Sequence, residues 1–173
     1  MITLTDIAYV RSGVADLDAA TQFATGIVGL ELVTPTEVGV THLRADHRHH
    51  CLALVEGPSG VISSGFAVAS SDALDAAETE LERSGITVHR GSAAEARSRR
   101  VREFIAFDDP FGNRLELVNQ QETVARPVNF SRGAGITELA ICAWTRPTCT
   151  RPTGSGARAS TPGCRTGSGM PPA

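Results

Sequence analysis

The sequence predicts an α+β domain built from two βαβββ units in tandem, which form a curled mixed sheet with the helices packed outside. Three observations support this fold. The order strand, helix, strand, strand, strand occurs over about residues 2–57 and again over about residues 61–119. Each predicted helix ends at a glycine, and the last two strands enclose a turn that contains proline and glycine. One domain over residues 1–120 is therefore expected.

The first unit opens with a strand that starts at Ile2 and ends near Gly13. Asp16 is a good N-cap for an amphipathic helix over residues 17–27, which Gly29 stops. Three more strands are expected, separated by polar residues that include the turn Asp46-His47-Arg48. These strands are predicted at Leu30–Val33, Val38–Ala45 and Cys51–Val55.

The second unit repeats this order after Gly60. Its strand carries Phe66 and Val68, its helix begins at a cap formed by Ser71 or Asp72 and ends at Gly85, and a further strand begins at Ile86. The polar, arginine-rich run Glu95–Arg102 is interpreted as a solvated loop whose charge Glu95 and Glu103 compensate. Two strands close the unit, at Val101–Phe107 and Arg114–Val118.

The last two strands form a β-hairpin. Pro110 fixes φ for the turn, and Gly112 and Asn113 are residue types that accept positive φ. Glu116 lies between Leu115 and Leu117, so its carboxylate points to the opposite face of the strand. Periodicity alone favours a solvent-facing Glu116; on the inner face of a curled sheet the carboxylate would need a metal, a cation or water.

The hairpin reads Asp109-Pro110-Phe111-Gly112-Asn113-Arg114-Leu115-Glu116-Leu117. It resembles the DPxGNxxEL signature of the vicinal-oxygen-chelate superfamily, which contains glyoxalase I, bleomycin and fosfomycin resistance proteins, and type I extradiol dioxygenases. The signature turn corresponds to Asp109, Pro110, Gly112 and Asn113. The superfamily's architecture is also a duplicated βαβββ pair, and the resemblance covers about residues 2–119.

The resemblance implies where a metal would bind. In this superfamily the ligands come from the first strand of each unit and the last strand of the second, which here correspond to Tyr9, to Ser63 or Ser64, and to Glu116. A mononuclear Fe(II) oxygenase site needs two imidazoles and one carboxylate on one side of the ion. Only Glu116 meets that need, so we expect no metal, no cofactor and no catalytic residue in this domain.

The missing ligands narrow the resemblance to one branch. Type I extradiol dioxygenases contain two such domains, of which the N-terminal one lacks ligands and the C-terminal one holds Fe(II). The strand Asp6–Val10 and the stretch Leu43–Leu54 resemble the metal-free domain of catechol and 2,3-dihydroxybiphenyl dioxygenases. The resemblance implies a chain that is truncated before the iron-binding domain and inactive alone, with a small aromatic diol as the substrate of the intact enzyme. The alternative is a dimeric small-molecule binding protein of the bleomycin-resistance kind.

Five histidines occur in the chain, and three of them, His47, His49 and His50, are close together. On a strand, His49 and His50 would point to opposite faces, and His47 falls in a turn, so a metal cluster is disfavoured. We expect Tyr9, His50 and Glu116 to line the cleft between the two units. His42 and His89 are interpreted as ordinary strand histidines.

Composition limits the partners. A net charge of −3 over 173 residues gives no attraction for nucleic acid, and no apolar run is long enough to cross a membrane. We therefore expect a cytoplasmic protein with four reduced cysteines, at Cys51, Cys142, Cys149 and Cys164. Loss of a partner domain could expose apolar surface and favour a homo-oligomer.

The end of the chain departs from the domain pattern. Residues 121–135 form a polar linker, residues 136–145 resemble the first strand of a second domain, and residues 146–173 have a composition typical of disorder. In the superfamily that strand continues as Gly-His. Reading the codons of Ala140–Gly156 one frame over permits GHLCLDAPDVHAAYRFW, with histidine at the position of Ile141. A reading-frame slip is thus one explanation of the tail; a genuine disordered tail is the other.

Overall fold

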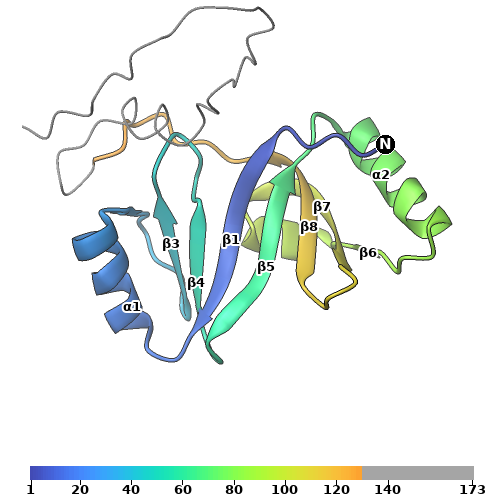
Figure 1. The fold of residues 1–173 in the computed structure, drawn as a ribbon. Coiled ribbons are helices and arrows are strands. Elements are labelled where there is room, and N and C mark those ends of the chain that lie inside the picture. Colours follow the sequence, from blue (N-terminus) through green and yellow to red (C-terminus); the bar gives the residue numbers. More distant parts are fainter. Residues whose placement is uncertain (130–173) are drawn as a thin grey trace, which may run out of the picture.

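The computed structural model describes residues 1–129, which fold around one eight-stranded mixed sheet (Figure 1). The strand order in the sheet is β2-β3-β4-β1-β5-β8-β7-β6. The strands are β1 (Asp6–Val14), β2 (Glu31–Leu32), β3 (Val40–Arg44), β4 (Leu52–Glu56), β5 (Gly60–Ala67), β6 (His89–Arg90), β7 (Val101–Asp108) and β8 (Arg114–Gln121). The helices are α1 (Leu17–Phe23), the π-helix η1 (Ala24–Val28), α2 (Ser71–Arg83) and α3 (Ala93–Ser98).

The strand order repeats itself across the middle of the sheet. Reading inward from either edge gives β2-β3-β4-β1 on one side and β6-β7-β8-β5 on the other, which is the same order of elements in each half. β1 pairs with β4 in parallel, as β5 does with β8, and the antiparallel pair β1–β5 joins the halves. The predicted α+β fold with a mixed sheet is confirmed.

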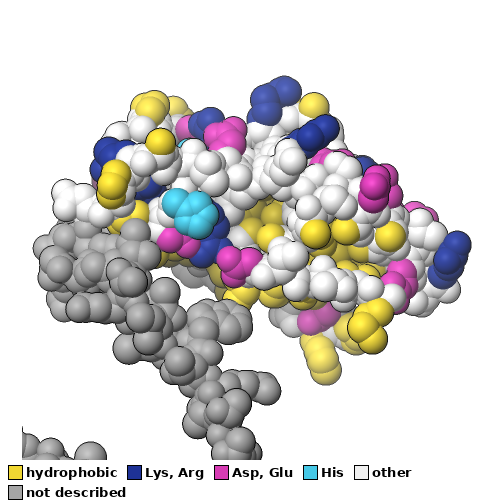
Figure 2. Space-filling view, turned by 90° about the horizontal axis from the view of Figure 1, so that it is seen from above, with side chains coloured by type: hydrophobic (Ala, Val, Ile, Leu, Met, Phe, Trp, Pro, Cys, Tyr) yellow, Lys and Arg dark blue, Asp and Glu magenta, His cyan; other side chains and the backbone are white. Residues whose placement is uncertain are grey.

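Two helices cover the outer face of the sheet, one over each half (Figure 1). α1 and η1 pack on β3 and β4 through Ala24, Leu43 and Leu54. The apolar residues of α2 pack on β7 and β8; this cluster contains Leu74, Ala77, Leu81, Ile105, Phe107 and Leu117. Seen from above, apolar side chains gather on the half of the molecule that carries α2 (Figure 2).

A third apolar cluster lies on the inner face of the sheet. It contains Tyr9, Ala96, Val101, Phe104, Ala106 and Val118. Phe104 and Ala106 point inward from β7, whereas Ile105 and Phe107 point outward to α2, as the two-residue period of a strand requires. Ala96 comes from α3, so this short helix covers the inner face of the second half.

The helices α1 and α2 both start at a capping side chain. Asp16 Oδ1 accepts a hydrogen bond from Ala19 N at 2.8 Å, which confirms the predicted cap. The second helix is capped by Ser70, whose Oγ accepts from Ala73 N, and not by Ser71 or Asp72 as predicted. Ser71 instead belongs to the first turn and contacts Glu103. Gly29 and Gly85 adopt positive φ after the helices, at 89° and 79°, as their predicted role requires.

The arginine-rich run is not a loop, which corrects the prediction for Glu95–Arg102. Residues 93–98 form α3, and a capping box starts it: Ser92 Oγ accepts from Glu95 N, and the Glu95 carboxylate accepts from Ser92 N. Strand bounds differ too. β1 begins at Asp6 and continues through Gly13, β5 begins before Phe66, and the strand expected from Ile86 is reduced to β6.

After β8 the chain returns to the first half of the sheet. The His49 backbone N–H donates to Glu122 O at 2.7 Å, and the Arg44 guanidinium donates to Arg126 O and Pro127 O at 3.1 Å each. Arg44 also pairs with Glu31, and Arg126 contacts the same carboxylate. The described part of the predicted linker is therefore held against β2 and β3. The predicted strand at 136–145 and tail at 146–173 lie outside the described residues.

Within residues 1–129, no helix combines the length and the apolar character needed to cross a membrane.

The packing at Gly91 gives a first prediction. A Cβ atom added there would lie 2.0 Å from Phe104 Cε1, and Phe104 is fully buried. Gly91→Ala should therefore lower the free energy of unfolding by about 1–3 kcal/mol. Gly26→Ala is the matched control, because a Cβ at Gly26 meets nothing within 4 Å; it should be neutral or slightly stabilising. Urea unfolding followed by circular dichroism measures both, and equal effects would contradict the packing argument.

Candidate functional site

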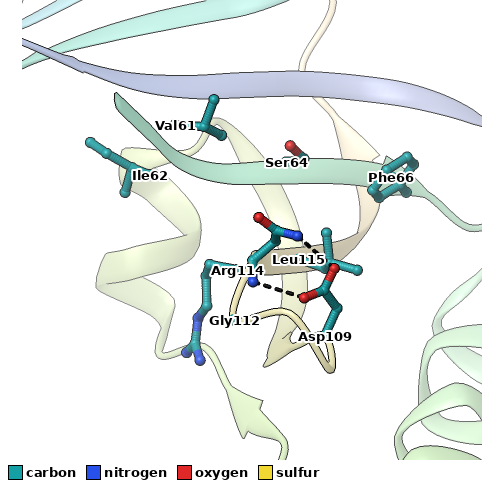
Figure 3. A pocket seen from close by; sticks show the side chains of 9 residues that line it. Val61, Ile62, Ser64, Phe66, Asp109, Gly112, Arg114 and Leu115 are labelled. Carbon is teal, nitrogen blue, oxygen red and sulfur yellow. Dashed lines mark hydrogen bonds between the residues drawn. The ribbon is translucent and has the colours of Figure 1, made fainter. Parts of the chain in front are cut away.

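The signature turn is built around the Asp109 carboxylate. Its oxygens accept hydrogen bonds from the backbone N–H groups of Phe111 and Asn113 and from Asn113 Nδ2, at 2.7–2.8 Å. The hydrogen bonds from the side chain and backbone of Asn113 are the main reason why the pKa of Asp109 lies below its usual value. Gly112 adopts positive φ (83°), as predicted. Figure 3 shows this turn beside the apolar side chains of β5 that line a shallow pocket with it.

The turn sets the register of β8 and so places Glu116 on the inner face of the sheet. The side chain is 1% exposed, so it does not face solvent. Arg99 binds the carboxylate with two hydrogen bonds, Nε–Oε2 and Nη2–Oε1, both 2.9 Å, and Tyr9 Oη donates to Oε2 at 2.6 Å. Burial opposes the charge on Glu116, but these donors outweigh it, and the pKa of Glu116 lies below its usual value.

Tyr9 reaches Glu116 across the junction of the two halves. It is fully buried on β1, and a Cβ at Gly65, its partner on β5, would lie 2.8 Å from the ring. The absence of a side chain at Gly65 therefore makes room for the phenol. Burial, and then the charge of Glu116, raise the pKa of Tyr9 far above its usual value, so Tyr9 acts as a neutral hydrogen-bond donor.

Arg99 is the site residue that sequence reasoning missed. The sequence predicts a solvated loop here, with Glu95 and Glu103 as compensating charges, but the Arg99 side chain is only 12% exposed and its guanidinium stacks 4.1 Å from the Phe104 ring centroid. Glu95 instead caps α3, and Glu103 pairs with Arg90. Glu116 itself indicated that a partner such as Arg99 must exist, because a carboxylate buried on the inner face requires a cation.

Three imidazoles lie together beside Tyr9. His50 stacks on the Tyr9 ring at 5.1 Å, and His42 lies 4.5 Å from His50 between ring centroids. His49 Nδ1 is 3.1 Å from His50 Nδ1, so the two rings do not point to opposite faces as predicted. The reason is that residues 49 and 50 lie between β3 and β4, outside either strand. His47 is exposed in its turn, as predicted.

The buried imidazoles are neutral. Burial, followed by the neighbouring histidines, lowers the pKa of His42 to about 4 and that of His50 to about 2. His42 was interpreted as an ordinary strand histidine without a partner, and the structure corrects this: its ring contacts both His49 and His50.

The ligand positions that the resemblance implies, at Tyr9, Ser63 and Glu116, carry side chains that do not suit Fe(II). Both oxygens of Glu116 already accept hydrogen bonds from Arg99, and the remaining two positions carry a phenol and a hydroxyl, at Tyr9 and Ser63. An Fe(II) oxygenase site would need two imidazoles there. Within residues 1–129, no group of three His, Cys, Asp or Glu side chains has an arrangement that could hold a metal ion.

A duplicated sheet closed by this hairpin defines the class of protein. The profile of the Glyoxalase/Bleomycin resistance protein/Dioxygenase superfamily matches residues 6–117, and the chain belongs to this superfamily. Among curated proteins it is similar to type I extradiol dioxygenases, over their N-terminal part.

Two curated relatives and one solved structure show how far the similarity extends. The chain is 32% identical over 118 residues to 1,2-dihydroxynaphthalene dioxygenase of Sphingobium xenophagum and 34% identical over 118 residues to biphenyl-2,3-diol 1,2-dioxygenase of Sphingomonas paucimobilis. Each alignment covers 68% of this chain and 40% of the relative. A crystal structure of catechol 2,3-dioxygenase superposes with a TM-score of 0.71 and 31% identity, over 75% of this chain and 44% of the other. The chain thus spans about 40% of the length of these curated relatives.

The Arg99–Glu116 pair predicts a large effect on stability. Arg99→Met should lower the free energy of unfolding by about 3–5 kcal/mol, because it leaves the Glu116 carboxylate buried without its cation. Arg97→Met is the control, since Arg97 lies in the last turn of α3, two residues before Arg99, with an exposed side chain; it should change stability by less than about 0.5 kcal/mol. Chemical unfolding of the three proteins compares them, and an Arg99→Met protein as stable as Arg97→Met would refute the pairing.

The neutral histidines predict a pH dependence. Well above pH 6.5, the ordinary histidine pKa, these imidazoles are neutral in both the folded and the unfolded protein. Below pH 6.5 the unfolded protein binds a proton on each imidazole, whereas in the folded protein His42 and His50 stay neutral down to about pH 4 and about pH 2. Stability should therefore fall as the pH drops from 6.5 to 5, by up to about 1.4 kcal/mol per pH unit for each histidine. Unfolding measured across this range should show a shallower slope in His42→Gln than in the parent chain, and an equal slope would contradict a neutral His42.

Proposed function

We propose that residues 1–129 are the metal-free, non-catalytic N-terminal domain of a type I extradiol ring-cleavage dioxygenase of aromatic catabolism. The observation that carries the proposal is the Arg99–Glu116 pair. The carboxylate that the superfamily signature would give to a metal is buried and held by a guanidinium and a phenol. The similarity to extradiol dioxygenases over about 40% of their length supports the same conclusion.

The role of such a domain is to support the rest of the enzyme. In the intact protein, Fe(II) and a small aromatic diol would bind in the second domain, where the metal would hold the diol and dioxygen together. The segment after β8 would connect the two domains. Its described part is fixed to the first half of the sheet by Arg44 and Glu31.

A reading-frame slip after Leu139 would account for the departure of the following sequence from the superfamily pattern. The codons of Leu139, Ala140 and Ile141 permit Gly-His in the other frame, where the first iron ligand of the superfamily would stand. The slip would be either a real event in the gene or an error in its sequence.

The alternative, a dimeric binding protein of the bleomycin-resistance kind, requires an accessible cleft around Tyr9, His50 and Glu116. The structure brings these three side chains together, but they are 0%, 1% and 1% exposed. No observation on the described residues favours this second function over the first.

The proposal predicts the behaviour of two proteins. The 173-residue chain, loaded anaerobically with Fe(II) and then exposed to air, should consume no dioxygen with catechol or 2,3-dihydroxybiphenyl, because Glu116 is not free to bind the ion. Resequencing the gene across the codons for Leu139 and Ala140 should reveal whether the other reading frame stays open and encodes a second domain. If it does, the protein translated in that frame should bind iron and consume dioxygen with one of these diols.

Two outcomes would overturn the proposal. One is that the 173-residue chain binds iron stoichiometrically and cleaves the ring of one of these diols. The other is a gene that is correct as written and a chain that binds an aromatic ligand as a stable dimer, measured by calorimetry and light scattering, which would establish the binding protein instead.

A further inference from the structure

The signature turn carries an exposed phenylalanine on a rigid support. Phe111 is 90% exposed, and its backbone N–H donates to Asp109 Oδ1 at 2.8 Å. The Gly112 N–H donates to Asp109 O, and the Asp109 N–H donates to Asn113 O, both at 2.9 Å. Hydrogen bonds therefore fix the backbone on both sides of Phe111. A single exposed apolar side chain is common on protein surfaces, but this one is held in a defined position.

A shallow pocket of about 410 Å³ lies directly beside this turn; we call it the turn pocket. β5 and β8 begin to pair at Ser64 and Leu115, so the earlier residues of β5 and the turn before β8 separate and leave a hollow between them. In Figure 3, Ile62 and Phe66 stand at either end of the β5 segment that borders the pocket, with the turn opposite them. Val61, which is 69% exposed, also lines it.

The size and depth of the turn pocket suit a phenyl ring supplied by another protein. An apolar cavity of about 150 Å³ is enough to hold benzene. A shallow pocket covers only part of a free small molecule, whereas a ring that is already fixed on a rigid turn loses little freedom when it binds. Phe111 does not fill the pocket of its own chain, because its side chain is exposed.

The anchor and the pocket are neighbours on the surface, and this determines the kind of assembly. Phe111 is followed directly by Gly112, which lines the turn pocket. A twofold axis close to the turn therefore brings the Phe111 of each copy to the pocket of the other, and the interface closes at two copies. An anchor far from its pocket would produce rings or filaments instead.

The charges at this edge are compatible with such an axis. Arg114 lines the turn pocket and pairs with Asp108 of the same chain, at 3.2 Å between Nη1 and Oδ1. Their side chains are 38% and 60% exposed. Each copy thus brings an exposed cation beside an exposed anion, and two copies can exchange these partners without leaving either charge unpaired. The Asp109 carboxylate is already bound within the turn.

We propose that two copies of this chain associate through this edge of the sheet, with Phe111 of each copy inserted into the turn pocket of the other. Phe111 is the anchor of the interface, and Val61 and Ile62 surround it. The contact is small, so the dimer is weak and reversible. The proposal is independent of the function proposed for residues 1–129, because a dimer that binds no aromatic ligand leaves that function as it stands.

The test is sedimentation equilibrium of the 173-residue chain with a thiol reductant, at concentrations from about 1 μM to about 1 mM. We expect a reversible monomer–dimer equilibrium. Phe111→Ser should raise the dissociation constant about a hundredfold, because a lost anchor costs about tenfold and the twofold axis counts it twice. Val61→Lys, which places a charge in the pocket, should act similarly. Val38→Ser and Val38→Lys are the matched controls, since Val38 is fully exposed between β2 and β3, and they should leave the constant unchanged.

A mixture of the two variants tests the exchange of anchors directly. Phe111→Ser keeps a free pocket but has no anchor, and Val61→Lys keeps the anchor but has a blocked pocket. Neither variant can form an intact contact with itself, whereas one copy of each retains one intact contact. The mixed pair should therefore associate about tenfold more tightly than either variant does with itself.

Thermal unfolding of the same samples checks folding, and the midpoints should not change because both side chains are exposed. If Phe111→Ser fails to fold, Val61→Lys and its control decide the test. A chain that stays monomeric at the highest concentration would disprove the dimer. Association that Phe111→Ser leaves unchanged would place the contact elsewhere in the chain, and oligomers larger than two would rule out the twofold arrangement.

Discussion

The interior of this domain depends on one constraint, which is the neutralisation of a carboxylate that the hairpin forces onto the inner face of the sheet. The register of β7 and β8 places Glu116 opposite Ala106, with 1% of its surface exposed. A charge in that position must meet a cation or lose its proton. Arg99 supplies the cation through two parallel hydrogen bonds, and the rest of the inner face is arranged around this pair.

The short helix α3 positions the arginine that neutralises Glu116. Its six residues could not form a stable helix alone. The Ser92–Glu95 capping box starts it, Ala96 fixes it to the apolar cluster of the inner face, and Arg99 at its end reaches Glu116 over the ring of Phe104. The helix thus delivers a guanidinium to a place where the superfamily pattern would put a metal ion, and it covers the inner face at the same time.

Features that depend on local residue chemistry could be predicted from the sequence. The hairpin followed from Pro110 and Gly112, the helix ends from Gly29 and Gly85, and the duplication from the repeated order of patterns. Features that depend on which distant side chains meet could not. α3 has a capping box but no apolar periodicity, so the sequence predicts a loop where the helix forms. The histidine cluster could not be predicted, because it depends on the backbone path of residues 47–50 between β3 and β4, and periodicity does not indicate that path.

The inner-face network also explains how the two halves of the sheet are held together. Tyr9 from the first half bonds Glu116 of the second across the β1–β5 junction, in the space that Gly65 leaves open. Arg100 adds a contact from the end of α3 to Glu37 in the connection between β2 and β3. The link between the halves is therefore made by protein side chains: the phenol of Tyr9 and the guanidinium of Arg99 meet on the one carboxylate of Glu116.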